Sequence, residues 1–129
     1  MTDAIKIPRL ALRMTHWDLV GAILLLKKDN KHFKEESLAY GLQRVHAEHV
    51  DFQNYFSRPQ IIPGEIEHLL GFMNMNQIVQ YTGDWQYMFM TSDGKKLIED
   101  GVKKMYGKDS LQTIEPLADL VWKYAKEYH

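Results

Sequence analysis

Two histidines, His46 and His49, come nearest to a chemical site, because they lie one turn apart on a predicted helix and acidic residues flank them. Imidazole and carboxylate groups together bind divalent transition metals. Two imidazoles on one helix are only half a site, so further ligands, for example His68 or His16, would have to come from elsewhere. We therefore expect no bound metal. The alternative to a metal site is that the His49 ring lies in the core or in an interface, where it hydrogen-bonds a neighbour, and that His46 is solvated.

Other catalytic patterns are missing from the sequence. There is no nucleophile paired with a base, no glycine-rich phosphate loop and no carboxylate dyad at a recognisable spacing. The chain has no cysteine, which excludes disulfides and thiolate zinc sites. We expect a protein that is not an enzyme and needs no cofactor.

Length and charge limit the class of protein further. A chain of 129 residues is expected to form a single domain spanning 1–129. Its formal net charge is -1, so any DNA binding must come from local basic patches. The longest apolar run, Leu19 to Leu26, is too short to cross a membrane, and Arg9 and Arg13 interrupt what would be a signal peptide. A cytoplasmic location without membrane contact is the expectation.

The chain is organised around residues 61–94. Pro63 suits the first turn of a helix, and the apolar residues that follow share one helical face. They are Ile66, Leu69, Leu70 and Met73. This helix is expected to end between Asn74 and Asn76, because asparagine tolerates the left-handed backbone conformation that ends helices.

A β-hairpin and a capped helix are predicted next. Alternating patterns over Gln77–Tyr81 and Trp85–Met90 indicate two strands, joined by a turn in which Gly83 would supply a positive φ. Thr91, Ser92 and Asp93 each offer an N-cap oxygen to the following helix. That helix is expected to carry the apolar residues Leu97, Ile98, Val102 and Met105.

This order of helix, hairpin and capped helix resembles the winged-helix superfamily. The resemblance is carried by the segment Leu69–Val79, followed by Thr91–Gly94, with Asn76 where a glycine usually stands. It implies a mainly α fold with a small β-hairpin (α+β), in which a winged helix-turn-helix core over about 15–106 carries additional N- and C-terminal helices. Size and terminal helices look similar to small regulators of the MarR and PadR kind.

Helices are also predicted before and after this core. Thr15 caps a helix running to about Lys28, and a long helical pattern covers residues 34–56. The basic segment before Thr15, with Arg9 and Arg13, is expected to pack through its apolar residues, and the alternative is an arm that touches phosphate.

The last helix is predicted over about 113–128, with Thr113 as its cap and Pro116 in its first turn. Its apolar stripe consists of Leu117, Leu120, Val121, Tyr124 and Tyr128. The resemblance implies that this stripe forms a homodimer interface. The alternative is that it packs on its own domain.

Two functions follow from the resemblance and the charges. The first is a homodimeric transcriptional regulator that binds double-stranded DNA. Its candidate contact residues are Arg58, Gln60, Glu65, His68, Thr82, Trp85 and Gln86. The second is a winged-helix protein-interaction module without DNA binding, because the outward positions of helix 63–74 offer carboxylates and no arginine or lysine.

Overall fold

The computed structural model describes residues 7–28, 32–48 and 63–128. Within these ranges the chain is mainly helical, with a small three-stranded antiparallel sheet, which confirms the predicted α+β class. In chain order the elements are η1 (Ala11–Arg13), α1 (His16–Leu25), β1 (His32–Phe33), α2 (Glu35–Glu48), α4 (Pro63–Met75), β2 (Val79–Tyr81), β3 (Met88–Met90), α5 (Ser92–Tyr106) and α6 (Ser110–Ala125).

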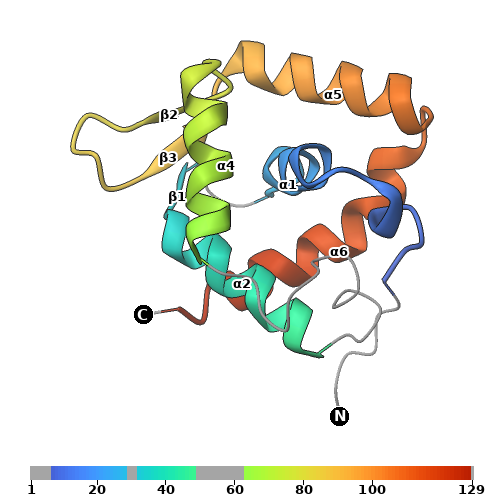
Figure 1. The fold of residues 1–129 in the computed structure, drawn as a ribbon, viewed down its shortest axis with the longest axis horizontal. Helices are drawn as coiled ribbons and strands as arrows, with labels where there is room; N and C mark the ends of the chain where they lie inside the picture. Colours follow the sequence, from blue (N-terminus) through green and yellow to red (C-terminus); the bar gives the residue numbers. More distant parts are fainter. Residues whose placement is uncertain (1–6, 29–31, 49–62, 129) are drawn as a thin grey trace.

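Helix α1 lies at the centre of the fold, with α5 on one side, α2 and α6 on the other, and α4 across its end (Figure 1). Its start is fixed by Thr15, whose hydroxyl oxygen accepts a hydrogen bond from the Asp18 backbone N–H at 3.1 Å, as predicted. Leu19, Val20 and Ile23 have no exposed surface. A helix surrounded by others must be apolar on most sides, as this sequence is.

The segment before α1 packs on the domain, as expected. Ile7, Ala11 and Met14 are buried, whereas Arg9 and Arg13 are exposed.

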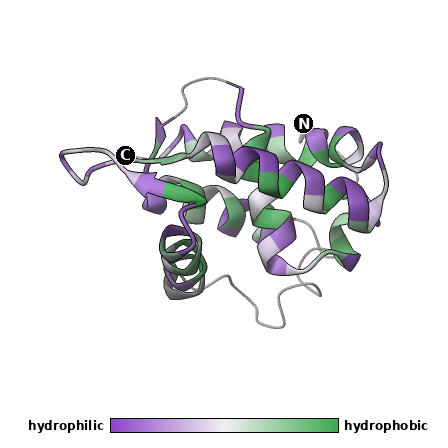
Figure 2. Cartoon of the chain, turned by 90° about the horizontal axis from the view of Figure 1, so that it is seen from above, coloured by the Kyte–Doolittle hydropathy of each residue, from purple (hydrophilic) through white to green (hydrophobic). Residues whose placement is uncertain are grey.

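The sheet has the strand order β1-β3-β2. Strand β1 was not predicted, because two residues are too few to show an alternating pattern. His32 pairs with Phe89 and Phe33 with Met88, so β1 joins the predicted hairpin from a distant part of the chain. In Figure 2, which views the molecule from the α5 side, the hairpin extends beyond the helices.

Both reversals at the ends of β2 differ from the prediction. The residue with positive φ after α4 is Gln77 (62°) rather than an asparagine, and in the hairpin it is Trp85 (64°) rather than Gly83. The loop is also wider than a glycine turn, because the strands end at Tyr81 and resume at Met88.

Of the three predicted cap residues, Thr91 caps helix α5, and its hydroxyl oxygen accepts from the Gly94 N–H at 2.8 Å. Its inner face buries Ile98 and Val102. Leu97 and Met105 are 58% and 70% exposed, because α5 lies at the edge of the molecule and only one side of it meets the core.

Helix α6 begins at Ser110, earlier than predicted, so Thr113 and Pro116 lie inside it. The Thr113 hydroxyl donates to the Asp109 carbonyl oxygen at 3.1 Å instead of capping the helix. Helix α6 packs along α2, of which the described part ends at Glu48. The remainder of the predicted helix 34–56 lies outside the described residues.

Candidate functional site

The outer face of α4 is the first part of the candidate site. Ile66, Leu70 and Met73 point into the core and are almost completely buried, as predicted from their spacing. The opposite side exposes Phe72 and Met75, which are 51% and 77% accessible. Two large apolar side chains that are exposed on adjoining turns of one helix form an apolar patch on the protein surface.

The hairpin supplies the second part. Trp85 is 73% exposed, and its ring packs on that of Tyr81 with centroids 5.1 Å apart. Side chains of the loop bond its own backbone: the Asp84 carboxylate accepts from the Thr82 hydroxyl and from the Gln86 N–H. These two bonds hold the pKa of Asp84 below its usual value, the Thr82 bond contributing most. The loop is therefore internally fixed while it presents Trp85 outward.

An open groove joins the two parts. Its volume is about 640 Å³, and it runs along the outer turns of α4 to the end of β2. The lining residues are Glu67, His68, Gly71, Phe72, Met75 and Tyr81. Across Tyr81 a second hollow of about 340 Å³ extends toward Trp85. We call the exposed residues Phe72, Met75 and Trp85 and the half-buried Tyr81, with the groove between them, the α4–hairpin surface.

Negative charge borders this surface. Burial raises the pKa of the Tyr81 phenol, and the carboxylates of Glu35, Glu67 and Glu36 raise it further. The pKa of Glu35 is itself raised, first by burial and then by Glu67 and Glu36. The first turn of α2 and the middle of α4 thus place three carboxylates within electrostatic reach of Tyr81. No lysine or arginine is among the groove's lining residues in the described part of the chain.

The predicted DNA-contact residues are only partly brought together. His68, Thr82, Trp85 and Gln86 lie on α4 or the hairpin loop, with His68 in the groove and packed edge-on against Phe72. Thr82 is used inside the loop, where its hydroxyl oxygen accepts from the Tyr87 N–H at 3.3 Å. Arg58, Gln60 and the side chain of Glu65 lie outside the described residues.

The predicted dimer stripe is used largely within the chain. Leu117 and Val121 have no exposed surface and Leu120 is 5% exposed, because this face of α6 packs in the domain's own core. The expectation that these three side chains form the surface of a dimer seam is therefore corrected. Tyr124 is half-buried beneath the Arg44 guanidinium, and Tyr128 packs on Tyr40.

Only one member of the predicted histidine pair lies within the described residues. His46 is completely buried in the core, so the interpretation of His46 as solvated is wrong, and His49 lies outside the described ranges. No group of three or more potential metal ligands occurs in the parts of the chain that the structure describes.

Sequence reasoning missed the exposure of Phe72 and Met75. A signal was present, because His68, Phe72 and Met75 are spaced four and three residues apart and so form a second stripe beside the buried one. Two stripes on one helix indicate two packing surfaces, of which the domain itself covers only one.

Comparisons with protein-family models, with curated proteins and with solved structures found no match for this chain. Among the described helices, none combines the length and the apolar character that crossing a membrane requires. The fold and the site therefore rest on the geometry above.

Proposed function

We propose that this chain is a winged-helix domain that binds a protein partner through the α4–hairpin surface. The chain order of α1, β1, α2, α4 and the hairpin supports the fold.

The exposure of Phe72, Met75 and Trp85 on one surface carries the functional part of the proposal. Aromatic residues and methionine are enriched in protein interfaces, whereas large apolar patches are uncommon on surfaces that meet only water. Nucleic-acid binding would instead require lysine or arginine against phosphate. The cluster of Glu35, Glu36 and Glu67 repels phosphate.

Charge complementarity defines the partner. Its segment carries an apolar or aromatic side chain that enters the groove beside Phe72 and Met75, with lysine or arginine nearby to pair with the three carboxylates. The expected anchors are Phe72, Met75 and Trp85, because binding energy concentrates in a few large side chains near the centre of an interface.

A selection of displayed random peptides tests this function. We expect the wild-type protein to enrich peptides in which Lys or Arg flanks an aromatic or aliphatic residue. Phe72→Ser and Met75→Ser should each weaken these peptides by about tenfold or more. Leu97→Ser is the matched control, because Leu97 is an equally exposed apolar residue on α5, and it should leave the affinities unchanged.

Stability measurements show whether a variant loses peptide binding because its surface has changed or because it no longer folds. Met75→Ser should change the free energy of unfolding by less than about 0.5 kcal/mol, whereas the buried Met73→Ala should lower it by about 2–5 kcal/mol. Selected peptides that lack basic residues, or that lose as much affinity with Leu97→Ser as with Met75→Ser, would argue against this surface.

A DNA-binding regulator is the second proposal, favoured by the same order of helices, strand and hairpin. Anisotropy of a labelled random duplex at low and at near-physiological salt separates the two. Binding that weakens steeply with salt, with a slope reduced by about one unit in Arg58→Ala, would favour DNA. No binding at low salt would leave the protein partner as the function.

A further inference from the structure

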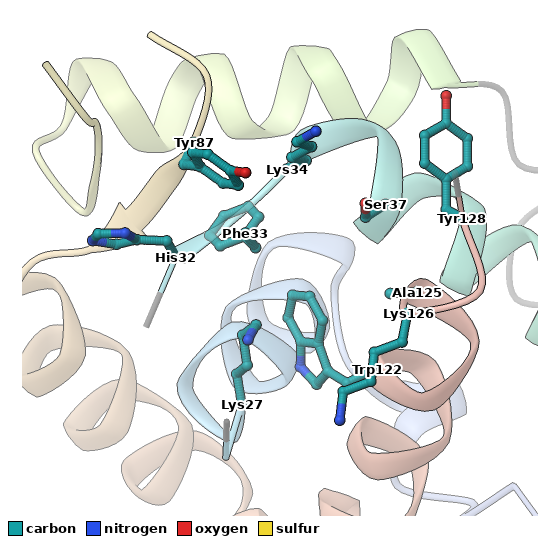
Figure 3. A pocket seen from close by; sticks show the side chains of 10 residues that line it. All are labelled: Lys27, His32, Phe33, Lys34, Ser37, Tyr87, Trp122, Ala125, Lys126 and Tyr128. Atoms are coloured by element: carbon teal, nitrogen blue, oxygen red, sulfur yellow. The ribbon is translucent and has the colours of Figure 1, made fainter. Parts of the chain in front are cut away.

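A second pocket, separate from the α4–hairpin surface, lies where the ends of α1 and α6 meet β1 and the hairpin (Figure 3). Its volume is about 340 Å³, within the range of small-molecule sites. The lining combines the three cations of Lys27, Lys34 and Lys126 with the aromatic rings of Tyr87, Trp122 and Tyr128. No aspartate or glutamate from the described part of the chain lines it.

The aromatic floor of this pocket is fixed. Trp122 is only 7% exposed, and its indole Nε1–H donates to the Ile23 carbonyl oxygen at 2.8 Å. Phe33 meets the Trp122 ring edge-on, with centroids 5.8 Å apart. A floor held from α1, β1 and α6 at once keeps its shape when the pocket is empty, so a ligand need not order it on binding.

Two of the cations are held at defined positions by aromatic rings. Lys27 Nζ lies 5.2 Å from the centroid of Trp122, and Lys34 Nζ lies 5.5 Å from that of Tyr87. In Figure 3 the two side chains come from different sides of the pocket. Lys126 adds a third charge from the end of α6. Several lysines in one pocket, where no carboxylate of residues 7–28, 32–48 and 63–128 is part of the lining, favour an anion of more than one charge.

Ser37 also lines the pocket, from the first turn of α2, and Glu35 and Glu36 of the same turn are not among the lining residues. The nearby carboxylates of Glu115 and Asp119 are already paired with Lys28, at 3.1 and 3.2 Å, and do not line the pocket.

We propose that this pocket binds a nucleoside monophosphate. The phosphate dianion is placed among Lys27, Lys34 and Lys126. The base packs against the Tyr87 or Tyr128 ring, because a planar heterocycle stacks on aromatic side chains. A nucleotide would contact both parts of the lining, its base meeting the aromatic side chains and its phosphate meeting the lysines. An apolar ligand would leave the lysines without a contact, and an isolated anion would leave the aromatic side chains without one.

Calorimetric titrations at low ionic strength test the ligand class. We expect the four common nucleoside monophosphates to bind at least about tenfold more tightly than the matching nucleosides, inorganic phosphate or benzoate, since each of these lacks the ring or the dianion. Phosphate binding as tightly as a nucleotide would overturn the proposal in favour of a simple anion site. Affinity for oligothymidylate that rises with length would overturn it in favour of single-stranded nucleic acid.

Variants test the location. Lys34→Gln with Lys126→Gln should weaken nucleotide binding by at least about tenfold, because two charged contacts are lost. Lys104→Gln removes an exposed lysine on α5 and should have no effect. An equal loss with Lys104→Gln would mean that only overall charge matters and would overturn the site.

A measurement on the unaltered protein completes the test. Adenosine monophosphate should shift the NMR signal of the Trp122 indole N–H and leave that of Trp85 in place. A shift of Trp85 without one of Trp122 would contradict the proposal.

Discussion

Gly41 of α2 faces the backbone carbonyl of Val121 in α6 so closely that a Cβ at position 41 would lie 2.4 Å from that oxygen. The same Cβ would lie 3.3 Å from the backbone nitrogen of Ala125. Backbone atoms cannot rotate away as a side chain can, so only glycine allows the two helices to approach this closely. The Arg44 guanidinium carbon, one turn further along α2, lies 4.4 Å from the centroid of the Tyr124 ring and extends the same contact.

Gly41→Ala should therefore lower the free energy of unfolding by about 1–3 kcal/mol, because the helices must move apart. Gly101→Ala is the matched control, since Gly101 is also helical and a Cβ there would meet nothing within 4 Å. It should raise stability by about 0.5–1 kcal/mol. Urea unfolding of both variants checks this, and equal effects would refute the close approach.

The Thr91 cap supports a second prediction. Its hydroxyl accepts from the Gly94 N–H and donates to the Gln77 carbonyl oxygen at 2.8 Å, so it joins the start of α5 to the end of α4. Thr91→Ala should cost about 1–2 kcal/mol of stability. Thr113→Ala, which removes an exposed hydroxyl inside α6, should change it by less than about 0.5 kcal/mol. Thermal unfolding with comparable losses for both would contradict the assignment of Thr91 as the cap.

The Tyr124 phenol gives the third prediction. A hydrogen bond to Glu48 contributes most, followed by burial and the charge of Glu48, to a pKa raised from 10.0 to about 12. The folded protein thus keeps this proton where the unfolded chain has lost it. The resulting stability is complete below pH 10 and is lost as the pH rises through about 12.

Spectrophotometric titration of the tyrosines at 295 nm should show one phenol that ionises at higher pH than the others, and we expect this phenol to be that of Tyr124. Glu48→Gln should bring its pKa back toward the ordinary value, and Tyr124→Phe should remove the late step. A late step that persists in Tyr124→Phe would assign the raised pKa to another tyrosine.

Much of the helical framework could be predicted, because its signals are local. The spacing of Ile66, Leu70 and Met73 defined the buried face of α4, and the oxygens of Thr15 and Thr91 marked the starts of α1 and α5. Cap hydrogen bonds join residues three apart in sequence, so sequence patterns describe them well.

Tertiary relationships were harder to predict. Strand β1 exists because the hairpin lies beside it, and no pattern within two residues records that pairing. The stripe of α6 was correctly recognised as apolar, but an apolar stripe is the same whether it packs on its own domain or on a second copy. The pocket containing Lys27, Lys34 and Lys126 combines distant segments, and each lysine alone resembles an ordinary solvated residue.

The backbone of Trp85 has one further consequence. Its φ of 64° lies in the left-handed region, which a large side chain adopts only at a cost of about 1–3 kcal/mol. Glycine would occupy the same position without that cost but would leave no ring beside Tyr81. Engineering for thermal tolerance would therefore select against the same side chain that engineering for recognition must keep. At position 85, backbone stability therefore favours glycine, whereas the proposed binding surface requires the tryptophan ring.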